Sequence, residues 1–147
     1  MKPSSGNSRS IRSDVMYEYE IKVQKVIDGD TIDVLFDVGF SMFREERVRL
    51  AGIDTPETAT KDKREKAFGT EAKVFVGEWL RGKKNLRAKT TKDDKSGRIL
   101  AHIYDEEGKC LNEEMVARGY AWKYDGTTKT KDLNVLLEQR RVAQEKG

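Results

Sequence analysis

Hydrophobic and polar positions alternate in the first third of the chain, and this period predicts strands there. From Tyr17 to Gln24 the two kinds of residue take turns, as in a half-buried strand. The alternation resumes after Asp28-Gly29-Asp30, a typical turn sequence, and places Val38 on the apolar face of a strand at 32–38. Further strands are predicted at 43–50, 86–91 and 98–104.

The period lengthens to that of a helix between the third and fourth strands. Apolar residues from Phe68 to Leu80 recur at helical spacing, so one face of an amphipathic helix is buried. Gly82 is expected to end this helix. The preceding segment, 58–66, is charged and lacks periodicity, and it is predicted to be a surface loop.

Two further helices are predicted near the C-terminus. Residues 111–116 form a short helix, and Gly119 is positioned to end it as a C-terminal cap. Residues 120–130 are interpreted as a loop, and Thr130 is able to cap the start of the last helix. This helix is expected to dock through Leu133, Leu136 and Leu137.

The order of these elements indicates the fold class. Three strands, a helix, two strands and two helices are typical of an α+β fold. Short strands in this order suggest a small Greek-key barrel, because closure removes exposed sheet edges. Residues 1–15 are polar and are predicted to be a flexible N-terminal arm, and residues 16–147 to be a single domain.

Composition narrows the possible functions. The 147 residues include one cysteine and one histidine, which excludes an intrachain disulfide, a Cys/His zinc site and a two-histidine acid–base mechanism. The formal net charge is only +3, but Lys and Arg dominate from Arg81 to Arg98, which suits a phosphate backbone. The alternative for this basic stretch is a solvated, lysine-rich hairpin.

The sequence also indicates a location. With no apolar signal or membrane-spanning run, the protein is expected to be cytoplasmic and to have no membrane partner.

Two turns carry closely spaced carboxylates. They are Asp28-Gly29-Asp30-Thr31 and Asp54-Thr55-Pro56-Glu57. If the turns are neighbours, Asp30 and Asp54 can share a hard cation. Calcium is a candidate for this cation, because it accepts oxygen ligands in irregular geometry. The alternative is that both aspartates only stabilise their own turns by bonding the local backbone.

Two arginines are candidate phosphate ligands, Arg49 at the end of a strand and Arg98 at the start of another. A guanidinium group is permanently charged and can bind two phosphate oxygens at once. Glu57 is the candidate general base, or the group that orients the attacking water. The alternative for Arg49 is an ordinary surface ion pair at a strand edge, and the alternative for Arg98 is a charge that opens a strand after a turn.

These segments resemble the signature segments of the staphylococcal nuclease (thermonuclease) family in order and spacing. The resemblance includes both acidic turns, Arg49 and Asp94-Lys95-Ser96-Gly97-Arg98. Leu111-Asn112-Glu113 and Gly119-Tyr120-Ala121 are similar to a fourth family segment.

The resemblance implies an OB-type, five-stranded Greek-key β-barrel with three helices and calcium-dependent hydrolysis of DNA and RNA, magnesium being less favoured. The substrate expected from it is single-stranded DNA or RNA, bound by a monomer. Carried over by motif, the catalytic residues are Arg49, Glu57 and Arg98, the metal ligands are Asp30, Asp54 and the Thr55 carbonyl, and the substrate-binding residue is Lys95.

Two other classes remain open at this stage. A catalytically inactive family domain would serve as a nucleic-acid or protein binding module, but such domains lose the acids and arginines that this chain keeps. A plain oligonucleotide-binding protein would expose aromatic residues on strand faces. Most aromatic residues here fall on apolar faces, whereas Tyr17, Tyr19 and Trp122 are undecided.

Three positions depart from the family pattern. Ser96 stands where the family commonly has a tyrosine, and the loop from Trp122 to Gly126 cannot be aligned, so Tyr124 is not assigned to the site. The chain also ends at Gly147 without the family's Gly-Leu-Trp-like anchor of the last helix.

Overall fold

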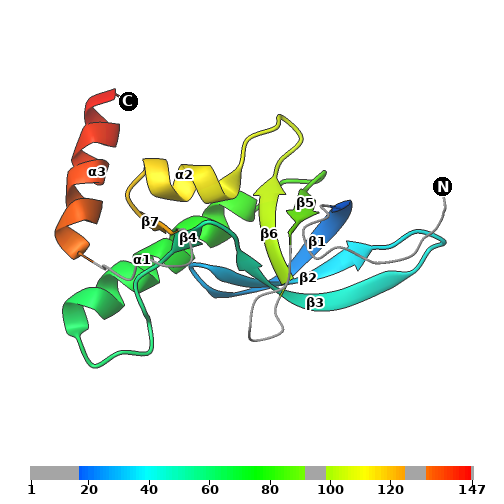
Figure 1. Cartoon of the computed structure of the whole chain (residues 1–147), viewed down its shortest axis with the longest axis horizontal. Coiled ribbons are helices and arrows are strands. Elements are labelled where there is room, and N and C mark those ends of the chain that lie inside the picture. Colours follow the sequence, from blue (N-terminus) through cyan, green and yellow to red (C-terminus); the bar gives the residue numbers. More distant parts are fainter. Residues whose placement is uncertain (1–16, 92–98, 125–131, 147) are drawn as a thin grey trace.

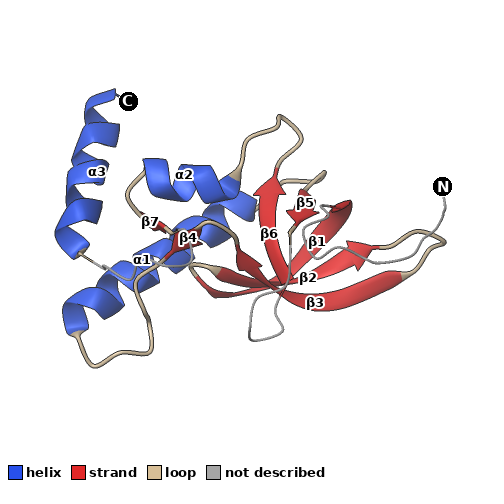
Figure 2. Cartoon of the chain, viewed as in Figure 1, coloured by secondary structure: helices blue, strands red, loops and turns tan. Residues whose placement is uncertain are grey.

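A computed structural model describes residues 17–91, 99–124 and 132–146. Five strands form a closed barrel in the order β1-β2-β3-β6-β5. These strands are β1 (Tyr17–Asp28), β2 (Thr31–Asp37), β3 (Phe43–Leu50), β5 (Arg87–Thr90) and β6 (Ile99–Tyr104). All neighbours are antiparallel except β3 and β6, which are parallel. With three helices beside it, the barrel confirms the predicted α+β, OB-type fold (Figures 1 and 2).

The first strand closes the barrel because it pairs on both sides. Its first four residues, from Tyr17, pair with β5, and Ile21 to Asp28 pair with β2. Register shifts after Val23 and after Val26 mark irregularities where the strand can bend. The interior is filled by side chains that are fully buried, among them Ile32, Val34, Val48, Leu50 and Ile103.

The first helix, α1 (Lys63–Leu80), begins earlier than its apolar pattern predicts. Asp62 accepts hydrogen bonds from the N–H groups of Arg64 and Glu65 and so caps the helix. The prediction of a loop through residue 66 is therefore wrong, because the first turn is exposed and carries no apolar signal. The predicted buried face is confirmed, since Ala72 and Val76 are fully buried.

The second and third helices, α2 (Leu111–Ala117) and α3 (Leu133–Lys146), pack against each other. Gly119 follows α2 with φ +79°, as its predicted capping role requires. Leu136 is fully buried, but Leu137 is 44% exposed, so the prediction that Leu137 anchors α3 is wrong. Arg140, one turn beyond Leu136, packs against the rings of Phe68 and Tyr120.

A small ribbon joins the barrel to the helices. It consists of β4 (Ile53–Asp54) and β7 (Trp122–Lys123), which pair antiparallel. The prediction of a continuous loop over 120–130 is wrong for β7, because a two-residue strand is too short to show a period. The predicted N-terminal arm, Thr130 with its capping role and the segment from Asp94 to Arg98 lie outside the described residues.

The hairpin between β2 and β3 projects at the end of the molecule away from α3 (Figure 1). The β2 strand stops at Asp37, and Val38 is 42% exposed, so its predicted place on a buried face is wrong. The chain turns through Phe40 and Ser41, both with positive φ. None of the described helices is long and apolar enough to cross a membrane.

Candidate active site

Arg49 lies between the two carboxylates that the sequence singles out. Its Nη2 atom is 3.6 Å from Oδ2 of Asp30 and 3.5 Å from Oδ1 of Asp54. All three side chains are mostly buried, with exposed fractions of 15–19%. Two acids from separate turns therefore converge on one positive group where water screens them poorly.

The backbone fixes the first half of this arrangement. Asp30 sits in the turn between β1 and β2, and its carbonyl accepts a hydrogen bond of 2.8 Å from the N–H of Leu50. Thr31 pairs directly with Arg49 in the ladder, and its hydroxyl donates to Oδ1 of Asp30 at 3.0 Å. The register of β2 and β3 therefore determines that Asp30 and Arg49 meet.

The β4–β7 ribbon places the second carboxylate. Asp54 pairs with Trp122, and Ile53 pairs with Lys123. Ile53 is 2% exposed and points into the core. Because successive side chains of a strand point to opposite faces, the carboxylate of Asp54 faces Arg49 instead.

The donor atoms suit a hard cation. Carboxylate and carbonyl oxygens are the ligands that calcium and magnesium prefer. Over residues 17–91, 99–124 and 132–146, no group of three or more His, Cys, Asp or Glu side chains is close enough to hold a metal ion. A cation held by Asp30 and Asp54 would therefore need backbone oxygen, such as the adjacent Thr55 carbonyl, and water.

Glu57 lies at the exposed end of the second acidic turn, and α1 supports its backbone. The N–H of Glu57 donates to Oε2 of Glu65 at 3.0 Å. A Cβ on Gly69 of α1 would come within 2.7 Å of the carbonyl oxygens of both Pro56 and Glu57. Glycine at 69 thus lets the turn rest directly on the helix while the Glu57 side chain reaches solvent.

Asp28 belongs to the same acidic region, although sequence reasoning gave it no role. Its Oδ1 accepts a 3.0 Å hydrogen bond from the hydroxyl of Thr58. Burial raises the pKa of Asp28 above its usual value, the Thr58 bond opposes this, and the carboxylates of Asp30 and Glu57 raise it further. The hydrogen bond ties the segment just after Glu57 to the first acidic turn.

Tyr124 is a second neighbour that sequence reasoning left unassigned. The guanidinium carbon of Arg49 lies 5.7 Å from the centre of the Tyr124 ring. The Tyr124 N–H donates to the carbonyl of Gly52 at 2.9 Å, so its backbone continues the β4–β7 ribbon. Its position after β7 could have been found only if that strand had been recognised.

The structure brings Asp30, Asp54 and Arg49 together and buries the adjacent Thr55 to 3% exposure. It places Glu57 at the exposed rim. Arg98 and Lys95, together with Ser96, lie outside the described residues, so their places in the site stay predictions.

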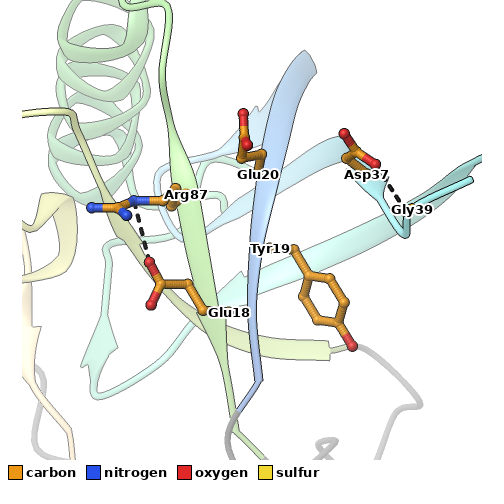
Figure 3. A pocket seen from close by; sticks show the side chains of 6 residues that line it. All are labelled: Glu18, Tyr19, Glu20, Asp37, Gly39 and Arg87. Atoms are coloured by element: carbon orange, nitrogen blue, oxygen red, sulfur yellow. Dashed lines mark hydrogen bonds and ion pairs between the residues drawn. The ribbon is translucent and has the colours of Figure 1, made fainter. Parts of the chain in front are cut away.

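A separate open pocket of about 500 Å³ lies near the β2–β3 hairpin (Figure 3). Three carboxylates line it, those of Glu18, Glu20 and Asp37, and the cation Arg87 is paired with Glu18 at 3.2 Å. An acidic lining repels phosphate, so this pocket is a poor candidate for a nucleic-acid site.

Comparison with known proteins identifies the family. The sequence profile described as Staphylococcal nuclease homologue matches residues 47–147. An uncharacterized endonuclease of Escherichia coli is 30% identical over 120 residues, covering 82% of this chain and 71% of that protein. An uncharacterized protein of Methanocaldococcus jannaschii is 33% identical, covering 86% of this chain and 70% of the relative. The thermonuclease of Staphylococcus hyicus is 33% identical over 105 residues, covering 71% of this chain and 59% of that protein. The chain therefore belongs to the family of staphylococcal nuclease homologues.

Proposed function

We propose that the protein is a calcium-dependent nuclease that hydrolyses phosphodiester bonds of single-stranded DNA and RNA. Family membership and the names of the relatives, an endonuclease and a thermonuclease, support a nuclease-type hydrolase. The observation that carries the proposal is the position of Arg49 between Asp30 and Asp54. An arginine beside two convergent acids combines a phosphate ligand with a cation site.

In this proposal Asp30, Asp54 and the carbonyl of Thr55 hold the metal ion. Calcium is favoured over magnesium because it accepts irregular oxygen geometry, whereas magnesium demands a near-octahedral shell. The bound ion would supply positive charge next to the phosphate, where negative charge grows during hydrolysis.

The side chains perform the other tasks. Arg49 and Arg98 bind the phosphate oxygens and stabilise the charge that develops on them, and Lys95 binds the neighbouring phosphate. Glu57 accepts a proton from the attacking water as its oxygen bonds to phosphorus and an ester oxygen leaves. The exposure of the Glu57 side chain gives water access to this position.

Cleavage of single-stranded DNA, duplex DNA and single-stranded RNA, each with calcium, magnesium or a chelator, tests the proposal. We expect calcium-dependent cleavage, fastest on a single strand. Arg98→Ala should lower activity more than Lys95→Ala, because a two-point clamp is lost instead of a single charge. Binding without cleavage under every metal would instead favour a nucleic-acid binding module.

A further inference from the structure

Part of β3 has an open edge. Its pairing with β2 runs from Phe43 to Arg49, but its pairing with β6 covers only Val48 to Leu50. In the part of the chain that the structure describes, no strand pairs with the outer side of residues 43–47. Figure 2 shows this half of β3 extending away from β6.

The direction of the free backbone groups follows from two hydrogen bonds. The N–H of Leu50 points to β2, where it donates to Asp30, and the N–H of Ala51 points to the other side, where it donates to Ala101. Backbone groups of a strand alternate in direction, and the β2–β3 register is unbroken. Phe43, Glu45 and Arg47 therefore direct their N–H and C=O groups outward, where they can template another strand.

The tip next to this edge is apolar and exposed. Val38, Met42 and Phe43 are 42%, 60% and 52% exposed, and Phe40 is 97% exposed. Phe40 and Ser41 adopt φ of +56° and +59°, which is uncommon for residues other than glycine. A cluster of exposed apolar side chains on a projecting hairpin indicates a contact surface.

The charges of the open edge are complementary to themselves. Residues 43–47 read Phe-Arg-Glu-Glu-Arg. If two copies pair antiparallel about a twofold axis at Glu45, Arg44 of each copy faces Glu46 of the other, and Phe43 faces Arg47. Only Glu45 meets a like charge, namely its own counterpart. Within a single chain Arg44 and Glu46 already form an ion pair, so their side chains lie on the same face of β3.

We propose that two copies of this protein associate through residues 43–47 of β3, antiparallel and centred on Glu45. The monomer expected from the family resemblance would then be in equilibrium with a dimer. The paired segment is short, so the interface is small and the dissociation constant should lie between about 10 µM and 1 mM. This inference does not depend on the nuclease assignment.

Sedimentation equilibrium of the full chain up to about 1 mM, together with amide hydrogen exchange, tests the proposal. We expect a monomer–dimer equilibrium and slower exchange at Phe43, Glu45 and Arg47 as the protein concentration rises. A wild-type protein that remains monomeric at the highest concentration would overturn the proposal. So would association that leaves these three amides unprotected, since another surface or the tip alone would then be responsible.

Charge variants separate this pairing from other modes. Glu45→Gln removes the central repulsion and should tighten the dimer by about two- to fivefold. Arg44→Glu should weaken it by about tenfold or more, and Arg44→Glu with Glu46→Arg should restore it. Glu107→Gln, on an exposed turn, serves as the control. Equal dissociation constants for all these variants would show that residues 43–47 are not the interface.

Discussion

Arg140 holds the last helix in place, and its replacement by alanine should destabilise the fold. Its guanidinium carbon lies 4.8 Å from the ring centre of Phe68 on α1 and 4.7 Å from that of Tyr120. Its Nε donates to the carbonyl of Gly119 at 3.0 Å, and Nη1 pairs with Glu71 at 3.0 Å. One side chain therefore connects α3 to α1 and to the segment after α2.

The size of the stability loss expected for Arg140→Ala follows from these contacts. Two cation–π contacts contribute about 1 kcal/mol each, and the charged hydrogen bond to Gly119 about 1.5 kcal/mol. The pair with Glu71 adds less than about 1 kcal/mol, because Glu71 is 54% exposed. Nη2 is buried and has no hydrogen-bond partner within the described residues. This atom destabilises the folded wild type by about 1–2 kcal/mol, and the alanine variant avoids that cost. The expected net loss is about 2–3 kcal/mol.

Arg141→Ala is the matched control. Arg141 is on the same helix and is ion-paired with Glu138 and Glu145, but it is 61% exposed, so its loss should change the stability little. Urea unfolding measures both, and Arg140→Ala should also lower the melting temperature by about 6–12 °C. Equal destabilisation by the two variants would refute the docking role of Arg140.

Three further substitutions test the acidic region and the histidine. Glu57→Gln should lower single-turnover cleavage by about 10²- to 10⁴-fold while oligonucleotide affinity, measured by anisotropy, is retained; unchanged cleavage would remove the proposed role of Glu57. Thr58→Val removes the hydrogen bond that lowers the pKa of Asp28, so it should reduce the free energy of unfolding by about 1 kcal/mol near neutral pH and by less in acid. Thr58→Ser is the control and should lose little stability in urea unfolding. A loss equal to that of the valine variant would exclude the hydroxyl as the cause. Burial lowers the pKa of His102, so the unfolded state gains the proton first and stability is lost as pH falls below 6.5. His102→Gln should therefore lose less stability than wild type between about pH 7 and pH 5, and parallel losses in urea unfolding would contradict this.

The sequence was sufficient to predict the barrel strands and the helices because burial leaves a period in them. The spacing from Phe68 reflects which side chains are buried, and so does the alternation around Ile21, although Tyr17 at the start of that strand is 52% exposed. The errors at Val38 and Leu137 arise because an apolar residue of the pattern is exposed in the structure. Two other errors fall where burial leaves no period. The ribbon of β4 and β7 is too short, and the first turn of α1 is fixed by the cap at Asp62.

The acidic turns and Arg49 could be selected from sequence because their residue types suit a metal and a phosphate. Their convergence in space depends on the register of β2 and β3. The sequence indicates this register only indirectly, because it predicts that the strands form a barrel. The contacts of Asp28 with Thr58 and of Arg49 with Tyr124 join segments far apart in the chain, so no local pattern predicts them. Arg98 and Lys95 remain sequence predictions.

Cleavage of single-stranded DNA by wild type, Asp54→Ala and Asp33→Ala, each with calcium and with a chelator, tests the proposed nuclease site. Asp33 is a suitable control because it is paired with Arg47 at 2.9 Å, outside the acidic turns. We expect calcium-dependent cleavage by wild type and Asp33→Ala and its loss in Asp54→Ala. Cleavage by Asp54→Ala at the wild-type rate, or cleavage that persists in the chelator, would contradict it.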